Sequence, residues 1–493
     1  MEIHFNKAFF LQHQRALGLI FCLIITGFFS TYKLLESPKT WFDEGMFVQI
    51  ARNAIEHRSY VLRASPTQVV PAGALATIGF PVIAPISISF YLFGEGLLQA
   101  RAVMVVYILL MVTALYLFAY RVWGFRGAFW STLLVASHAP VYGNGKNVLG
   151  EVPGLFFFFL LLYCISRIED LPLPLLRKEG KLWIVAGLSA GLFMATKPNF
   201  LLLLPVLGIA LLLRWKRLTP SWKELLGCFV ALAIPIVVNF LLQFGFTTSI
   251  FTSFAGYGNL PGLQQLTGLT LAGLIQKNAL LFVQQSTPAY LLVTVVVWIV
   301  SVCVRYRRKI SLPLHELVAI GFVIVTIAYF LKMPGFFRYL FVAQIITFPY
   351  FVASCFYLVS SKFRMILVIV FTMMVAFQLY QVSFRSWVAA YYQNLRTSEL
   401  TAFFGQLDPS KHVFFYHTLE AITFFKSDNY SQYFELLYYN DAFGKDQLMS
   451  LQNGVPDVVV MAEASEEKAR KFLTRYQKRT TLDHGNYLIF ERK

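Results

Sequence analysis

The 493-residue chain is 57% hydrophobic and 17% aromatic, and only 14% of its residues are charged, which excludes an ordinary soluble globular protein. The net charge of +17 does not indicate nucleic-acid binding, because residues 385–493 hold 13 Lys/Arg and 13 Asp/Glu. The positive excess therefore lies in short clusters between apolar stretches, as in polytopic membrane proteins.

Apolar stretches of the length that crosses a bilayer predict about eleven transmembrane helices. They cover 16–35, 98–120, 125–142, 149–167, 182–196, 198–213, 224–245, 288–304, 313–331, 339–359 and 364–383. The first stretch is expected to be retained, because no small-residue cleavage site follows it. All five cysteines lie within apolar stretches without metal-ligand spacing, so neither a disulfide nor a thiolate metal site is expected.

Positive charge predicts the orientation. With a cytoplasmic N-terminus, the inner segments carry 18 Lys/Arg in 58 residues, whereas the outer loops carry nine in 124. The positive-inside rule favours this arrangement. The apolar segment 76–93, broken by Pro81 and Pro85, is then interpreted as a helix lying in the outer interface, because a further span would invert everything downstream.

The C-terminal part of the chain has a different character. Apolar, β-rich stretches at Val413–Tyr416, Val458–Met461 and Tyr487–Phe490 are separated by helical patterns such as Glu466–Tyr476, which is typical of an α/β fold. We therefore expect a transmembrane domain over 1–384, with its first outer loop at 36–98, and a small extracytoplasmic α/β domain over 385–493.

An acidic pair, Asp43-Glu44, follows the first apolar stretch and begins a segment with apolar residues at helical spacing that extends to His57. This pattern predicts an amphipathic helix lying on the membrane surface. Carboxylates at a helix N-terminus also meet the positive end of its dipole. The two acids could therefore serve catalysis or only cap the helix.

A second acid, Glu151, is predicted at the outer end of the fourth span, after a glycine-rich turn and before a run of phenylalanines. A carboxylate beside so apolar a helix needs a partner or a role. Cations are predicted on the same face at Arg101, Lys197 and Arg338, the last followed by Tyr339. They could bind an anionic head group or only extend toward the interface.

These features resemble, in the same order along the chain, the GT-C glycosyltransferases, specifically the protein O-mannosyltransferase and aminoarabinose (lipid A) transferase group. The resemblance rests on Asp43-Glu44-Gly45, Gln99-Ala100-Arg101, Glu151, Thr196-Lys197 and Arg338-Tyr339-Leu340, and covers roughly residues 10–385. Two departures argue against assigning the aminoarabinose acceptor. The second acid is Glu151 where Asp is more usual, and no Pro-Pro occurs between Pro66 and Pro85. The Trp-Trp-Asp-Tyr-Gly sequence of oligosaccharyltransferases is absent.

The resemblance implies transfer of one hexosyl or pentosyl group from a polyprenyl-phosphate donor to a hydroxyl of a lipid, glycan or protein acceptor outside the cell membrane. Asp43 would be the general base, and Glu44 and Glu151 would orient it or the acceptor. Arg338, Lys197, Arg101 and Tyr339 would bind the donor phosphate. No obligatory metal or other cofactor is expected, although a divalent cation bridging Asp43 and Glu151 stays open.

Two other classes stay open from the residues. A secondary transporter would carry charges near the midplane of two corresponding halves, and only His315 and Glu316, near the inner end of a span, meet part of that description. A non-enzymatic polymer-binding membrane protein would use the C-terminal domain and leave Asp43 idle.

Overall fold

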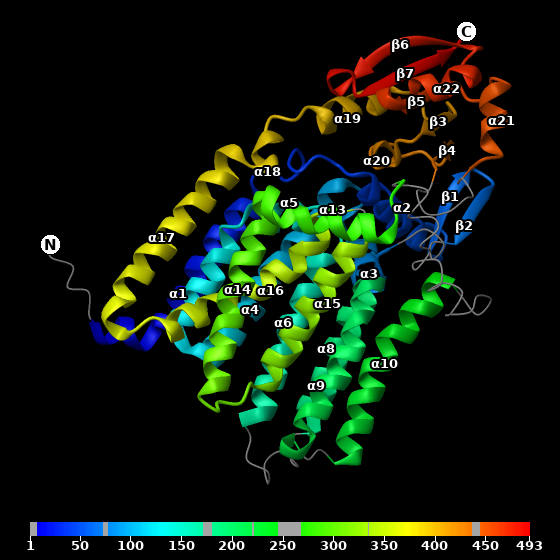
Figure 1. The fold of residues 1–493 in the computed structure, drawn as a ribbon. Helices are drawn as coiled ribbons and strands as arrows, with labels where there is room; N and C mark the ends of the chain where they lie inside the picture. Colours follow the sequence, from blue (N-terminus) through cyan, green and yellow to red (C-terminus); the bar gives the residue numbers. More distant parts are fainter. Residues whose placement is uncertain are drawn as a thin grey trace.

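The computed structural model describes residues 7–71, 77–170, 180–218, 221–244, 268–333, 335–435 and 444–493. A bundle of long helices occupies one part of the molecule, and a small sheet domain lies over one end of that bundle (Figure 1). Helix α2 and the β1–β2 hairpin lie between the two parts. The predicted fold class, a helical polytopic membrane protein with a small C-terminal α/β domain, is confirmed.

The bundle consists of ten long apolar helices among the described residues. They are α1 (Lys7–Thr31), α4 (Leu97–Ala136), α6 (Glu151–Asp170), α8 (Gly180–Thr196), α9 (Leu203–Leu218), α10 (Trp222–Phe244), α14 (Ser286–Arg307), α15 (Leu314–Lys332), α16 (Arg338–Leu358) and α17 (Arg364–Tyr380). Their interior is a continuous apolar core. The outer faces of helices such as α10, α14 and α17 expose large apolar side chains, including Phe229, Val293 and Ile369, as lipid contact requires.

The predicted spans correspond to helices of the structure. Within the described ranges, nine helical segments are at least 18 residues long and apolar enough to cross a membrane. One of them, α4, comprises two helical parts that meet at Gly124, whose φ of 69° and ψ of −168° are not helical. These two parts correspond to the predicted spans 98–120 and 125–142. The predicted span 182–196 coincides with α8, an apolar helix of 17 residues. With α4 counted as two spans and α8 included, the number agrees with the eleven expected.

The segments that connect the bundle helices at the sheet-domain end are themselves ordered. Helix α2 (Phe42–Glu56) confirms a helix over the segment expected from Asp43 to His57, but every residue from Glu44 to Asn53 is buried, so it does not lie open on a membrane surface as predicted. The antiparallel hairpin β1 (Val61–Ser65) and β2 (Gln68–Pro71) follows it. Helix α3 (Phe80–Phe93) has 14 residues, about 21 Å at 1.5 Å per residue, which is too short to span a bilayer of about 30 Å. The shorter helices α5 (Ala139–Gly145) and α13 (Leu271–Gln284) complete this layer.

The C-terminal sheet has five strands in the order β4-β3-β5-β7-β6. They are β3 (Val413–Tyr416), β4 (Tyr430–Tyr433), β5 (Val458–Ala462), β6 (Tyr476–Leu482) and β7 (Tyr487–Arg492). Strand β3 is parallel to β4 and β5, and β7 is antiparallel to β5 and β6. The three predicted strands are confirmed. The helix expected over 466–476 is shorter, because α22 (Glu466–Ala469) and the 3₁₀ turn η6 (Arg470–Phe472) end before β6 begins.

Both faces of this sheet are covered, which explains its apolar strands. One face packs on α19 (Arg396–Gln406) and α20 (Leu419–Ile422), through side chains such as Phe415 and Val460. The other packs on α21 (Gln447–Gln452) and α22, through side chains such as Phe414 and Val459. The domain is therefore a three-layer α/β unit.

Helix α2 packs directly against the C-terminal domain. A Cβ added to Gly45 would lie 2.4 Å from the carbonyl oxygen of Leu419 in α20, so only glycine permits this approach. The rings of Phe42 and Phe434 meet edge to face with centroids 5.4 Å apart. Leu419 and Phe434 belong to the apolar core of the helix bundle rather than to that of the sheet. The acidic pair is thus held between the two parts of the molecule.

Candidate active site

Asp43 and Arg338 form a partly accessible charge pair at the sheet-domain end of the bundle. An Arg338 guanidinium nitrogen donates to Asp43 Oδ2 at 2.5 Å, and the two side chains are 20% and 19% exposed. Arg338 also lies over the rings of Trp41 and Tyr339, 5.8 and 5.6 Å from their centroids. This aromatic cage fixes the guanidinium without consuming its hydrogen-bond donors.

Glu151 and Lys197 form the second pair, which is deeper. Lys197 Nζ donates to Glu151 Oε1, and the side chains are only 7% and 2% exposed. A Cβ on Gly150 would lie 2.8 Å from the carbonyl oxygen of Thr196, so glycine lets the start of α6 approach the end of α8 closely. Burial lowers the pKa of Lys197, and the charge of Glu151 opposes this shift.

The two pairs act as one cluster. Lys197 interacts electrostatically with Asp43 and Arg338 as well as with Glu151, and Arg338 interacts with Glu151 and Tyr339. Glu151 Oε2 is buried and has no hydrogen-bond partner among the described residues, and the same holds for Arg338 Nε. The cluster therefore holds two carboxylates, two cations and a phenol, with unused polar atoms that a ligand could engage.

Glu44 and Arg101 form a separate pair that is fully buried. Both side chains have 0% exposure, and Arg101 donates to the two carboxylate oxygens of Glu44 at 2.9 and 2.7 Å. The remaining guanidinium donors reach Asn147 Oδ1 and the carbonyl oxygens of Leu34 and Leu35. All five donors of Arg101 are thus committed within the protein.

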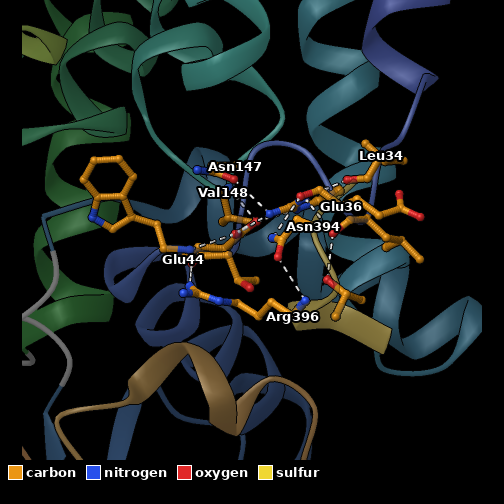
Figure 2. A network of polar contacts seen from close by, with 12 residues as sticks. Leu34, Glu36, Glu44, Asn147, Val148, Asn394 and Arg396 are labelled. Carbon is orange, nitrogen blue, oxygen red and sulfur yellow. Dashed lines mark hydrogen bonds and ion pairs between the residues drawn. The ribbon is translucent and has the colours of Figure 1, made fainter. Parts of the chain in front are cut away.

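The same pair ties several chain segments together. Glu44 also accepts from the backbone N–H groups of Trp41 and Val148. Figure 2 shows Glu44 in a polar network with Leu34, Asn147 and Val148, which continues to Asn394 and Arg396 at the start of the C-terminal region. Arg396 donates to the carbonyl oxygen of Thr40 at 3.0 Å. The network holds the backbone on both sides of Asp43.

Of the seven residues predicted for the site, the structure brings five together and places two elsewhere. Asp43, Glu151, Lys197, Arg338 and Tyr339 form the cluster. Arg101, expected at the donor phosphate, and Glu44, expected to orient Asp43 or the acceptor, instead neutralise one another in a fully buried pair. The N-cap of α2 is Trp41 rather than Asp43. Sequence reasoning also missed Phe434, whose contact with Phe42 joins segments almost 400 positions apart and leaves no local signal.

This architecture is similar to the GT-C fold of solved membrane glycosyltransferases. Residues 81–240 match the family described as dolichyl-phosphate-mannose-protein mannosyltransferase. A curated relative, the undecaprenyl phosphate-alpha-4-amino-4-deoxy-L-arabinose arabinosyl transferase of Pseudomonas aeruginosa, is 33% identical over 143 residues. That match spans 29% of this chain and 25% of the relative.

Two solved structures share the fold over nearly the whole chain. ArnT from Cupriavidus metallidurans bound to undecaprenyl phosphate is 13% identical to this chain, with a TM-score of 0.61. The structural alignment covers 97% of this chain and 98% of the ArnT chain. The Archaeoglobus fulgidus oligosaccharyltransferase, tethered to an acceptor peptide, is 13% identical and covers 98% of this chain and 74% of its own, with a TM-score of 0.59. The resemblance to GT-C glycosyltransferases of the protein mannosyltransferase and aminoarabinose transferase group is confirmed.

Proposed function

We propose that the chain is a membrane glycosyltransferase that moves one hexosyl or pentosyl group from a polyprenyl-phosphate donor to an acceptor hydroxyl. The observation that carries this proposal is the cluster of two acid–cation pairs, Asp43–Arg338 and Glu151–Lys197, at one end of an apolar helix bundle. Such a cluster offers a base beside cations, as transfer from a phosphate leaving group requires. The fold shared with ArnT supports the same reaction class.

The proposed step is a direct displacement. The acceptor oxygen bonds to the anomeric carbon while the bond from that carbon to the phosphate oxygen breaks. The hydroxyl proton passes to Asp43, and the electron pair of the broken bond leaves with the polyprenyl phosphate. Arg338 and Lys197 stabilise the charge that develops on the phosphate oxygens. Configuration at the anomeric carbon is inverted.

Arg338 explains how Asp43 becomes a free base. In this structure its guanidinium is committed to Asp43 at 2.5 Å. A donor phosphate is a competing anion for the same guanidinium. Donor binding would draw Arg338 toward the phosphate and release the Asp43 carboxylate to accept a proton. Glu151 remains paired with Lys197 and orients it, and Tyr339 supplies a hydroxyl beside Arg338.

We assign Glu44 and Arg101 a positioning role, since their buried pair leaves neither free for substrate. No cofactor is required by this step. A divalent cation between Asp43 and Glu151 would have to displace Arg338 and Lys197, which already neutralise these two carboxylates. This arrangement favours metal-independent transfer, and assays with a chelator and with added divalent salt test that expectation.

We propose that the cluster and the domain over 385–493 lie on the extracytoplasmic face of the cell membrane, and the charge bias of the sequence supports this orientation. Labelling intact cells with a membrane-impermeant maleimide tests this orientation. In a cysteine-free background, Asp446→Cys in the C-terminal domain should be labelled, whereas Lys309→Cys at the opposite end of the bundle should not. The reverse pattern would overturn the orientation.

Purified full-length protein tests the activity itself. Loss of sugar from a polyprenyl-phosphate donor should fall by about 100- to 10,000-fold in Asp43→Asn, and Glu151→Gln should also be impaired. Asp446→Asn, which changes an exposed carboxylate outside the cluster, is the matched control and should retain full turnover. Unchanged turnover in both Asp43→Asn and Glu151→Gln would refute the catalytic assignment and would favour a transporter or a non-enzymatic polymer-binding protein instead.

A further inference from the structure

The C-terminal domain contains a cavity of its own. Its volume is about 620 Å³, within the range of small-molecule sites. Two tyrosines at strand ends, Tyr416 and Tyr433, lie on one side of it. Glu435, Lys468, Lys471 and Phe472 are among the residues that complete the lining. None of these residues belongs to the cluster around Asp43.

The position of the cavity in the sheet is one where α/β folds bind ligands. Strands β4 and β5 both run parallel to β3, one on each side, so their carboxyl ends share one edge of the sheet. The strand order reverses between β3 and β5, and the cavity lies next to this point, since Tyr416 ends β3 and the lining residues of α22 and η6 follow β5. Ligands in open α/β sheets bind outside the carboxyl ends of strands at such a reversal. Tyr416 and Tyr433 end β3 and β4 at this edge.

The loop after β3 is strained at this point. His417 follows Tyr416 and has φ of 55°, a left-handed conformation that is uncommon for a residue with a side chain. Its ring contacts those of Tyr416 and Tyr433, with centroids 5.0 and 5.4 Å away. His417 Nε2 is buried and has no hydrogen-bond partner among the described residues. A strained residue with an unused ring nitrogen beside a cavity is more typical of a binding site than of simple packing.

The lining combines three kinds of chemistry. The half-buried ring of Phe472 offers apolar surface to the C–H face of a sugar, whereas Tyr416 and Tyr433 are only 3% and 6% exposed. Glu435 accepts a hydrogen bond from the Tyr433 hydroxyl at 3.1 Å and pairs with Lys468 at 3.8 Å. Arg470 and Lys471 are exposed in η6, and neither pairs with a carboxylate within the described ranges. Unpaired Arg and Lys side chains favour an anionic group on the ligand.

The cavity is also connected to the helix that carries Asp43. Side chains alternate along a strand, so Phe434, between the cavity residues Tyr433 and Glu435, points the other way. It is fully buried and packs on Phe42, the residue before Asp43. Only the end of strand β4 would thus separate a ligand in the cavity from the start of α2.

We infer that this cavity is a binding site for a carbohydrate that carries an anionic substituent, a carboxylate or a phosphate. If the chain transfers sugar as proposed above, this site holds an anionic glycan acceptor beside the transfer centre. The Phe472 ring packs on the sugar, Glu435 binds hydroxyl groups, and Arg470 and Lys471 bind the anion.

Saturation-transfer NMR on the full-length protein in detergent tests the binding without any donor. Trigalacturonate is the anionic probe, and maltotriose is a neutral probe of the same number of rings. Trigalacturonate should receive saturation and maltotriose should receive much less. Arg470→Ala and Lys471→Ala should each weaken trigalacturonate binding by about tenfold or more. Lys478→Ala, which removes an exposed lysine of β6 outside the cavity, should leave it unchanged.

The outcomes separate this inference from the proposed function. Absence of saturation, equal saturation of both probes, or equal losses in Lys471→Ala and Lys478→Ala would each overturn the carbohydrate site. Asp43→Asn should bind trigalacturonate as the unchanged protein does. If binding holds but no donor sugar is consumed by the unchanged protein, the proposed function fails alone. If transfer holds but the cavity variants leave the acceptor KM unchanged, the cavity inference fails alone.

Discussion

The buried pair Glu44–Arg101 offers a sharp test of the division between positioning and chemistry. Arg101→Met would leave the Glu44 carboxylate at 0% exposure with only the N–H groups of Trp41 and Val148 as partners, at 3.4 and 3.3 Å. An uncompensated buried charge of this kind costs about 3–5 kcal/mol. The double variant Glu44→Gln/Arg101→Met removes both buried charges. It should regain most of the lost stability, with a remaining cost of about 1–3 kcal/mol from hydrogen bonds that are no longer made.

The assay is the unfolding transition of the purified protein in one detergent, at a fixed scan rate because membrane proteins often unfold irreversibly. Arg479→Met is the matched control: Arg479 pairs with Glu491 but is 52% exposed, so its loss should cost about 1 kcal/mol or less. The folded double variant should still transfer sugar within about tenfold of the unchanged protein, since only positioning is affected. Loss of transfer in Glu44→Gln without loss of stability would refute this reasoning and assign Glu44 a chemical role.

Three further predictions follow from the same contacts. Lys197→Met should lower the free energy of unfolding by about 3–5 kcal/mol, because it leaves the Glu151 carboxylate buried without its partner. The double variant Lys197→Met/Glu151→Gln should regain stability, but both variants should remain impaired in sugar transfer. A double variant with normal turnover would show that this pair is only structural. Gly45→Ala should lower the free energy of unfolding by about 1–3 kcal/mol and also lower kcat, because the new Cβ meets the Leu419 carbonyl oxygen at 2.4 Å. Gly27→Ala is the control: a Cβ at Gly27 has nothing within 4 Å, so stability should change by at most about 1 kcal/mol. Equal effects of the two substitutions would exclude the contact between α2 and α20 as the cause. Burial and the neighbouring Glu95 raise the pKa of Glu56 from 4.5 to about 7, so the stability that this protonated carboxyl contributes is lost as pH rises through 7. The Tm of Glu56→Gln relative to the unchanged protein should therefore rise between about pH 4.5 and 7 and level off above pH 7, and a constant difference over that interval would count against the shifted pKa.

The helices of the bundle were predictable because an apolar stretch of about 20 residues has few alternatives in a membrane. The helix after Trp41 was predictable because its apolar residues recur at helical spacing, but its burial against the C-terminal domain was not, because that depends on contacts with distant segments. The two helical parts of α4 were predicted as separate spans for the same reason as the other bundle helices, and they meet at the non-helical Gly124.

The residues of the candidate site were predictable, but their pairing was not. Asp43, Glu151, Lys197 and Arg338 stood out because charge at the end of an apolar helix needs a partner. Which charges pair could not be known, because the partners come from distant segments: Arg338 is 295 positions from Asp43. The same limit hid the burial of Arg101 against Glu44. The contact of Phe434 with Phe42 depends on how the C-terminal domain docks, which no local pattern records.

The central claim is that Asp43 is the base of a sugar transfer from a polyprenyl-phosphate donor. Single-turnover transfer from a radiolabelled polyprenyl-phosphate sugar, with donor binding measured on the same samples, tests it most directly. In Asp43→Asn the transfer rate should fall by about 100-fold or more, while donor affinity is retained or increased because Arg338 loses its competing carboxylate. An unchanged transfer rate in Asp43→Asn, or a fall in rate explained entirely by lost donor binding, would contradict the claim.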